Sequence, residues 1–210
     1  TYLMTRHHVA SEDKLRIKIM DGYFSEQVQP DTYHDIKTWW EVIDRTTNEV
    51  VSTDNWDYNK DEQKVIIKDA KMWHEYTVSF LAYCIWDPTQ MYNHITNDWK
   101  DKPHDIPFDI RNENTNMHII EAMHNWLDNH PGTSVVRFTT FFYHFTLVFN
   151  NLKKEKYVDW FGYSSSVSAK ALKEFQKEKG YKLRAEDIID EGYYNSTFRV
   201  PKKAYLDYMD

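Results

Sequence analysis

Residues 73–86, "WHEYTVSFLAYCIW", form the stretch that most narrows the choice of fold. Successive side chains of a strand point to opposite faces, so an extended segment here is apolar on both faces. One face carries Tyr76, Val78, Phe80, Ala82 and Cys84, and the other carries Leu81, Tyr83 and Ile85. This pattern is typical of a parallel strand covered by helices on both sides. The stretch therefore predicts a buried parallel strand.

The residues after this strand predict a helix that begins at its carboxyl end. Asp87 can cap the helix, Pro88 suits the first helical position, and Gln90 stands at the last position of a capping box. Ligands of α/β proteins bind at the carboxyl ends of parallel strands. The first turns of this helix are therefore expected to face a site.

The rest of the chain predicts alternating helix and strand. Residues 117–132, "MHIIEAMHNWLDNHPG", predict a helix that stops at a Pro-Gly pair. Its inward face would carry Ile119, Ile120, Met123, Trp126 and Leu127. Residues 134–149 predict a second buried strand, and residues 166–181 predict a helix with Gly180 at its C-cap. This order implies a parallel sheet.

Residues 12–73 differ, because they hold short β-rich runs and show no helical period. They predict a small antiparallel β lobe inserted into a larger fold. The remaining residues, 1–11 and 74–210, are fewer than the roughly 200 or more that a complete eight-fold β/α barrel needs. The fold class is therefore α/β. We expect part of a TIM-like barrel, or a smaller open sheet, in residues 1–11 and 74–210, with a β-rich insertion at 12–73.

Composition excludes several classes of function. The 210 residues carry a formal net charge of −7, which argues against nucleic acid as the main partner because phosphate binding needs a basic face. No apolar run approaches the length of a membrane-spanning helix. The single cysteine, Cys84, rules out an internal disulfide and fits a reducing compartment. The histidine spacings do not predict a metal site.

Three side chains are candidates for ligand binding, and two of them, Asn93 and Trp160, are expected at the carboxyl edge of the sheet. Asn93 lies early in the helix that follows the first strand, where the alternative is a solvated amide. Arg137 interrupts an apolar run, so it needs either a ligand or a structural ion pair. Trp160 belongs to an aromatic loop whose rings suit stacking on a sugar but also suit packing. The residues alone leave these alternatives open.

Four stretches of the chain together resemble one family. They are "FLAYCIWDPTQMYNHITNDW" (80–99), "VVRFTTFFYHFTLVFNN" (135–151), "YVDWFGYSSSVS" (157–168) and "EDIIDEGYYNSTFRVP" (186–201). They are similar to β-galactoside phosphorylases of the galacto-N-biose/lacto-N-biose I phosphorylase type. The resemblance covers essentially the whole chain, and long aromatic-rich stretches are more specific than a short motif.

The resemblance implies a cytoplasmic, dimeric enzyme built on a TIM-like barrel with additional β domains. Such enzymes cleave Gal-β-1,3-GlcNAc or Gal-β-1,3-GalNAc with inorganic phosphate as co-substrate. The products are α-galactose 1-phosphate and a free N-acetylhexosamine, and neither a metal nor another cofactor is required. One branch of the family acts instead on galactosyl-β-1,4-rhamnose, which is the alternative specificity.

Carried over residue by residue, the resemblance implies a sugar-binding role for part of this chain. Asn93 and Arg137 match positions that hydrogen-bond the disaccharide, and Trp160 matches an aromatic residue of the sugar pocket. Pro88 and Thr89 match positions on the acceptor side. Thr89 stands where the family varies, so the acceptor sugar stays open.

The chain departs from the family pattern in its catalytic residue. The family's general acid is an aspartate near a Gly-Asp-His-Trp stretch, and this chain has no such stretch. We therefore expect an internal segment of the family, with no catalytic residue of its own. Two other hypotheses are a non-catalytic galactoside-binding protein and a fragment that folds poorly because part of a barrel exposes sheet edges.

Overall fold

The computed structural model describes residues 1–98, 100–101, 104–106, 108–137, 147–149, 156–158, 167–188 and 202–210. Its strands are β1 (Tyr2–Met4), β2 (His8–Val9), β3 (Leu15–Lys18), β4 (Val28–Pro30), β5 (Glu41–Asp44), β6 (Glu49–Val50), β7 (Trp56–Asn59), β8 (Lys64–Ile67), β9 (Glu75–Cys84), β10 (Leu147–Phe149) and β11 (Lys156–Val158). Its helices are α1 (Ile36–Trp39), η1 (Thr53–Asn55), α2 (Pro88–Asn97), α3 (Glu113–Asn129), α4 (Ala169–Lys179), α5 (Ala185–Ile188) and α6 (Lys203–Met209).

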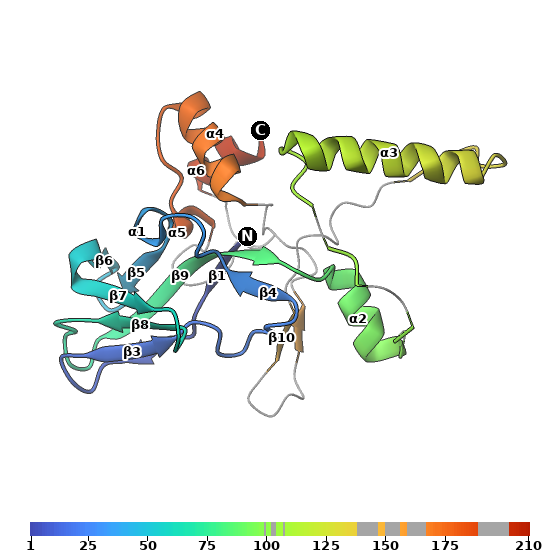
Figure 1. Ribbon diagram of the computed structural model, residues 1–210. Helices are drawn as coiled ribbons and strands as arrows, with labels where there is room; N and C mark the ends of the chain where they lie inside the picture. The colour runs from blue at the N-terminus through green and yellow to red at the C-terminus, as the bar shows by residue number, and fades with distance from the viewer. Residues whose placement is uncertain are drawn as a thin grey trace.

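Strand β9 is the centre of the molecule (Figure 1). It pairs with β1, β2, β4 and β5, and all four pairings are antiparallel. The register places Phe80 opposite Leu3 and Val78 opposite Val42. The predicted strand at 73–86 is therefore confirmed, but its predicted parallel pairing is wrong.

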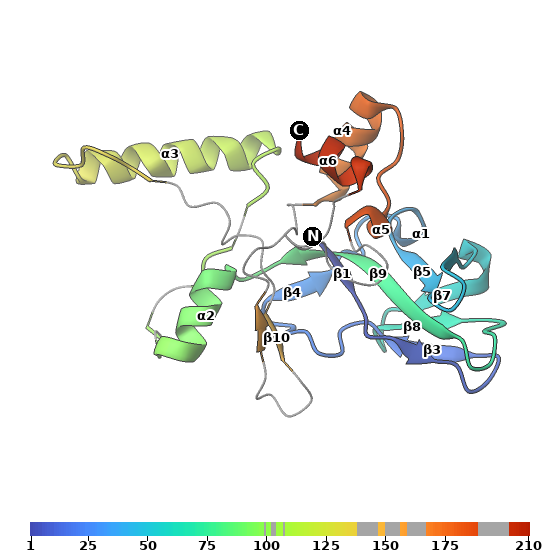
Figure 2. The same cartoon turned by 180° about the vertical axis from the view of Figure 1, so that it is seen from behind.

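The burial of both faces of β9 explains why the direction was predicted wrongly. On one face, Phe80 meets the ring of Trp40, which in turn packs on Tyr58 of β7. On the other face, the Thr77 hydroxyl accepts a hydrogen bond from Arg45, which binds Glu186 of α5. Figure 2 shows β9 between β3 and β8 on one side and α4, α5 and α6 on the other. A strand in the middle of three layers is apolar on both faces in either direction.

A second, three-stranded antiparallel sheet has the order β3-β8-β7 and lies wholly within residues 12–73. Strands β4 and β5 come from the same range of the chain, yet they pair with β9. One hydrophobic core joins the layers, and its members include Tyr2, Trp40, Trp56, Val78, Leu172 and Leu183. The strands described here are antiparallel and do not close into a barrel, and the predicted domain boundaries stay a prediction.

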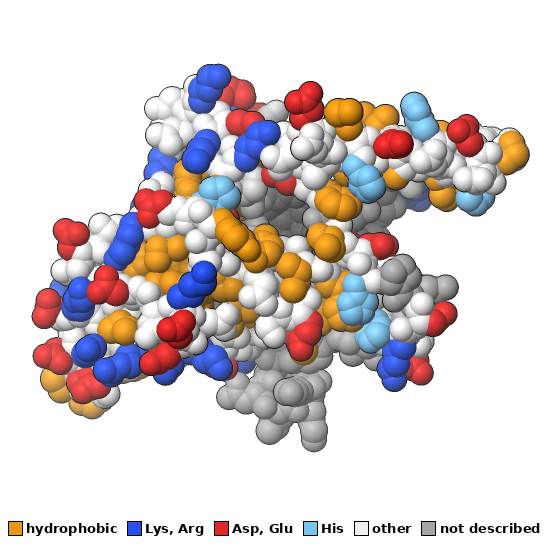
Figure 3. Space-filling view, in the orientation of Figure 1, with side chains coloured by type: hydrophobic (Ala, Val, Ile, Leu, Met, Phe, Trp, Pro, Cys, Tyr) orange, Lys and Arg blue, Asp and Glu red, His pale blue; other side chains and the backbone are white. Residues whose placement is uncertain are grey.

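The predicted helices form, but one of them lacks the expected cover. Helix α4 forms as predicted and buries Ala171, Leu172 and Phe175. Gly180, predicted as its C-cap, takes the left-handed φ of 78° that glycine favours. Helix α3 extends as an arm (Figure 1), and Figure 3 shows apolar side chains along it. Ile120 is 51% exposed and Trp126 is 44% exposed, so the described residues do not cover the face predicted to point inward.

The predicted second buried strand over residues 134–149 is only partly a strand. Residues 134–137 are irregular and exposed, and residues 138–146 lie outside the described part of the chain. Strand β10, at the end of this range, pairs antiparallel with β11, so parallel pairing with β9 is not found among the described residues. In the same described part of the chain, each helix is too short or too polar to cross a membrane.

Candidate functional site

The candidate site surrounds the beginning of α2, which follows directly from β9. Asp87 is the N-cap, and its side chain accepts a hydrogen bond of 2.9 Å from the backbone N–H of Gln90. Pro88 occupies the first turn, where its missing N–H costs nothing. The helix start predicted from the sequence is therefore confirmed.

The side chain of Gln90 does not complete the predicted capping box and instead binds the segment that follows α2. The backbone N–H of Asp105 donates to Gln90 Oε1 at 2.6 Å, and Gln90 Nε2 donates to the Asp105 carboxylate. The backbone N–H of Asp87 donates to the Asp105 carbonyl at 2.6 Å. These three bonds hold residues 104–106 against the first turn of α2.

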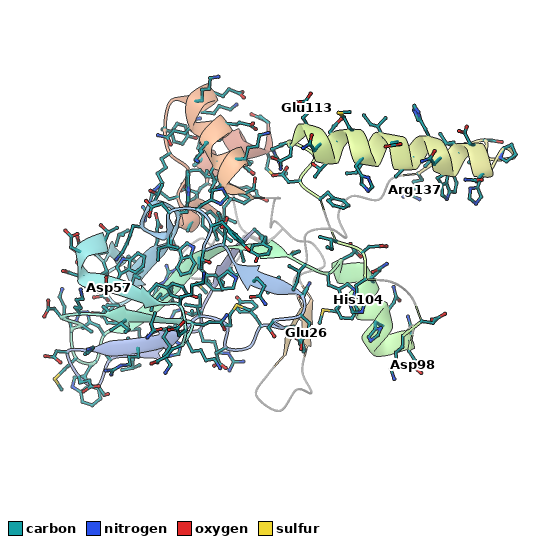
Figure 4. The ribbon with its side chains drawn as sticks, viewed as in Figure 1. Glu26, Asp57, Asp98, His104, Glu113 and Arg137 are labelled. Atoms are coloured by element: carbon teal, nitrogen blue, oxygen red, sulfur yellow. The ribbon has the colours of Figure 1, made fainter. Side chains whose placement is uncertain are left out.

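Three aromatic rings meet beside this turn. The Trp86 ring stacks on His104 with the centroids 3.5 Å apart, and it meets the His94 ring edge-on at 5.0 Å. The two imidazoles lie 5.7 Å from each other. Trp86 is 6% exposed, whereas His104, labelled at α2 in Figure 4, is exposed. The sequence offered no spacing that brings these three rings together.

Two buried nitrogen atoms of this ring cluster lack hydrogen-bond partners. Trp86 Nε1 and His94 Nδ1 are both buried and find no partner within the described residues. An unsatisfied buried polar atom costs about 1–3 kcal/mol, so a purely stabilising cluster would avoid it. The cluster therefore needs an explanation other than stability.

Asn93 lies on α2 next to His94, and its amide has a defined neighbour. Asn93 Oδ1 accepts a hydrogen bond of 2.6 Å from Asn97 Nδ2, one turn further along the helix. This bond directs the Asn93 amide oxygen towards Asn97. Asn93 is only partly buried, as a side chain that reaches a ligand must be.

The structure does not bring all the predicted site residues together. Pro88 and Thr89 occupy the first turn of α2, but their side chains lie outside what the structure describes, and so does all of Trp160. Arg137 is exposed and makes no ion pair with any described residue. Figure 4 shows Arg137 beside α3, apart from His104 at α2. The predicted burial of Arg137 is therefore wrong, and its role as a ligand stays a prediction.

Two groups near α2, Cys84 and Asp98, are poorly suited to covalent catalysis and to proton donation. Burial raises the pKa of the Cys84 thiol, which opposes formation of a nucleophilic thiolate. The hydrogen bond from Lys100 lowers the pKa of the Asp98 carboxyl, whereas a general acid needs a raised one. The described residues include no group of three or more His, Cys, Asp or Glu side chains that could hold a metal ion.

A separate hollow of about 200 Å³ lies between β5, β6 and β8. Two of its polar side chains already have partners: the Asp44 carboxylate is 2.7 Å from His74 Nδ1, and the Tyr76 hydroxyl accepts from the backbone N–H of Lys71 at 2.9 Å. None of the predicted site residues lines it. The turn at α2 is therefore the stronger candidate.

Comparison with known proteins assigns the chain to a family. The whole chain, residues 1–210, matches the family model described as the lacto-N-biose phosphorylase N-terminal TIM barrel domain. It is 53% identical over 210 residues to a 1,3-β-galactosyl-N-acetylhexosamine phosphorylase of Lachnoclostridium phytofermentans, covering 100% of this chain and 29% of that protein. It is 51% identical over 209 residues to the enzyme of that name from Bifidobacterium longum, covering 100% of this chain and 28% of that protein.

A third relative has a different name. A D-galactosyl-β-1→4-L-rhamnose phosphorylase of Lachnoclostridium phytofermentans is 38% identical over 212 residues, covering 100% of this chain and 29% of that protein. The chain thus spans less than a third of the length of each of these relatives. Because the family model matches its full length, the chain belongs to the family of lacto-N-biose phosphorylase N-terminal TIM barrel domains.

Proposed function

We propose that the protein containing this chain cleaves β-galactosides with phosphate. The substrates would be Gal-β-1,3-GlcNAc or Gal-β-1,3-GalNAc, and the products α-galactose 1-phosphate and the free N-acetylhexosamine. The observation that carries the proposal is the identity of 53% and 51% to two phosphorylases of this specificity. The chain spans under a third of each, so the activity is proposed for the whole protein.

The proposed reaction inverts the anomeric centre. One acid protonates the glycosidic oxygen while phosphate attacks the anomeric carbon from the opposite face. Phosphate is already an anion, so no base is needed to activate it. The acid would come from outside this chain, and the proposed TIM-like barrel would also be completed there.

This chain would supply part of the sugar-binding wall. Asn93 and Arg137 would hydrogen-bond the disaccharide and hold the scissile bond in line. Trp160 would stack on a sugar ring, and Pro88 and Thr89 would line the acceptor side. The position of Asn93 at a helix start beside the central strand supports its part of this assignment.

Several properties of the whole protein belong to the same proposal. We propose a cytoplasmic homodimer that needs no metal and no cofactor beyond the co-substrate phosphate. The proposal includes neither nucleic acid nor a membrane among the partners. The net charge of −7 supports the first of these exclusions.

The test is an assay of the full-length protein with galacto-N-biose or lacto-N-biose, with and without inorganic phosphate. We expect galactose 1-phosphate to appear only when phosphate is present. Release of free galactose in buffer without phosphate contradicts the proposal. Saturable binding of lacto-N-biose without turnover favours a non-catalytic galactoside-binding protein.

Galactosyl-β-1,4-rhamnose phosphorolysis is the second candidate, because one relative with that name is 38% identical to this chain. The same assay with the rhamnose disaccharide separates the two specificities. A product formed only from the rhamnose disaccharide assigns the protein to the second.

Arg137 provides a further test of the proposed sugar site. Its side chain is exposed and free of ion pairs with the described residues, so Arg137→Ala should leave the thermal midpoint within about 2 °C, as surface substitutions do. We expect kcat/KM of the full-length enzyme to fall by about 100-fold, since a charged hydrogen bond to substrate is lost. A large fall in the thermal midpoint with kcat/KM preserved contradicts the ligand role.

A further inference from the structure

The start of α2 is held by two sets of contacts that act on the same turn. One set is the hydrogen bonding of Gln90 and Asp87 to Asp105. The other is the stack of Trp86 on His104, with His94 against its edge. Residues 104–106 contribute to both sets, so this short segment fixes the helix from outside.

The residues that make these contacts flank the proposed sugar-binding residues of α2 along the chain. His94 follows Asn93 directly in the helix, and Pro88 and Thr89 lie between Trp86 and Gln90. A shift of residues 104–106 would therefore displace the backbone of the three proposed ligands that lie on α2, Pro88, Thr89 and Asn93. Misplacement of a binding group by about 1 Å can cost a hundredfold in rate.

Stability alone does not account for the choice of these rings. Trp86 Nε1 and His94 Nδ1 are buried without partners among the described residues, and apolar rings of similar shape would avoid that cost. Met91, 2% exposed, already supplies an apolar anchor for this end of the helix. Residues that reduce stability in this way are typical of functional sites.

We propose that Trp86, His94 and His104 form a positioning unit that sets the substrate-facing turn of α2, so that loss of the His104 ring weakens disaccharide use without unfolding the protein. The inference rests on the proposed phosphorolysis. None of the three rings is assigned a contact with substrate. They act through the backbone of α2 and the Asn93 side chain.

The test compares two variants of His104 in the full-length protein, assayed by phosphorolysis of lacto-N-biose. His104→Ala removes the stack, and we expect kcat/KM to fall by about 10- to 100-fold with a raised KM for the disaccharide. His104→Phe keeps a ring on Trp86 and should recover kcat/KM to within about threefold of wild type. The thermal midpoint of each variant should stay within about 3 °C, since His104 is exposed.

A matched control comes from a second Trp–His stack on α3. The ring of His130 lies 4.2 Å from Trp126, with an interplanar angle of 17°, on a helix that carries no proposed ligand. His130→Ala should leave both kinetic constants unchanged. Equal losses in the two alanine variants overturn the inference, because they would show a general effect of removing an exposed stack.

A second variant, Gln90→Glu, tests the same turn of α2 if His104→Ala fails to fold. Gln90→Glu places a carboxylate against that of Asp105 and opens the hydrogen-bonded side of the contact. The same loss of kcat/KM is expected. Wild-type kinetics in Gln90→Glu or in a folded His104→Ala overturn the inference while the phosphorolysis stands. A wild-type protein without phosphate-dependent cleavage overturns both.

Discussion

At the scale of single residues, the Asn93–Asn97 pair determines how α2 presents an amide to a ligand. Asn97 Nδ2 donates to Asn93 Oδ1 at 2.6 Å, so the oxygen of Asn93 faces along the helix. If the oxygen and nitrogen of this amide exchanged places, a sugar hydroxyl bound to it would have to reverse its role as donor or acceptor. Asn97 is therefore expected to matter for a ligand that it does not touch.

The first prediction concerns Asn97 in the full-length enzyme. Asn97→Ala should lower kcat/KM several-fold, and Asn97→Asp should lower it further, because a carboxylate repels Asn93 Oδ1 and favours the flipped amide. The measurement is steady-state phosphorolysis of lacto-N-biose. Asn129→Ala, which removes a similar i to i+4 contact at the end of α3, is the control and should have no effect. Equal rates for all three variants contradict the prediction.

Local signals at single residues could be predicted from the sequence, and contacts between distant segments could not. Asp87 and Gly180 were both predicted as caps, because a cap depends on residues within one turn. The stack of Trp86 on His104 spans the whole of α2, and nothing in the spacing indicates it. The same limit applies to Arg45, whose partner Glu186 is 141 positions away.

At the scale of elements, the N-cap of α4 connects two helices. The Ser168 hydroxyl accepts from the backbone N–H of Ala171 at 3.1 Å and donates to Asp109 Oδ2 at 2.6 Å. Asp109 also accepts from the backbone N–H of Arg111 at 3.1 Å, just before α3 begins. One carboxylate thus helps to anchor α4 and the approach to α3.

The second prediction is that the stability contributed by the Asp109 contacts depends on pH. Partial burial acts to raise the pKa of the Asp109 carboxyl, but hydrogen bonds from Ser168 and Arg111 outweigh it and lower the pKa below its ordinary value of 3.8. A carboxyl pKa that is lower in the folded state stabilises the protein above the unfolded value, and the contribution is lost as pH falls through the folded value.

Asp109→Asn should therefore lower the free energy of unfolding by about 1–2 kcal/mol at pH 7. The difference from wild type should shrink as the pH falls below the ordinary value of 3.8, because the wild-type carboxylate is then protonated as well. Urea denaturation across this range measures it. Asp128→Asn, at an exposed position on α3, is the control. A difference that stays constant with pH contradicts the prediction.

The main error of the sequence-based prediction was the parallel pairing of β9 with its neighbours, and this error has a physical reason. Apolar residues on both faces of the predicted strand indicated that β9 is covered on both sides, and Tyr76 to Ala82 are all buried. Coverage does not determine direction, because antiparallel β1, β4 and β5 leave β9 as deeply buried as parallel neighbours would. The apolar face of α3 predicted that this helix packs against another element, but none of the described residues covers that face.

At the scale of the whole molecule, one buried ion pair connects the sheet to the helices near the end of the chain. Arg45 Nη1 lies 2.8 Å from Glu186 Oε1, and the two side chains are 4% and 11% exposed. Arg45 Nε also donates to the Thr77 hydroxyl on β9 at 2.8 Å. Glu186 Oε2 is buried without a hydrogen-bond partner in the described part of the chain, so Arg45 provides most of the compensation for that carboxylate.

The last prediction follows from the dependence of the buried Glu186 carboxylate on Arg45. Arg45→Ala leaves a buried carboxylate unpaired, and such losses cost about 3–5 kcal/mol. Arg184→Ala is the matched control: it removes an arginine that binds Glu41 but is 46% exposed, so its cost should be about 1 kcal/mol or less. Urea denaturation of the full-length protein measures both. The double variant Arg45→Met with Glu186→Leu should recover most of the loss, because it removes the charge together with its partner. Equal costs for the two arginine variants would show that the pair contributes no more than a surface contact to holding α5 against the sheet.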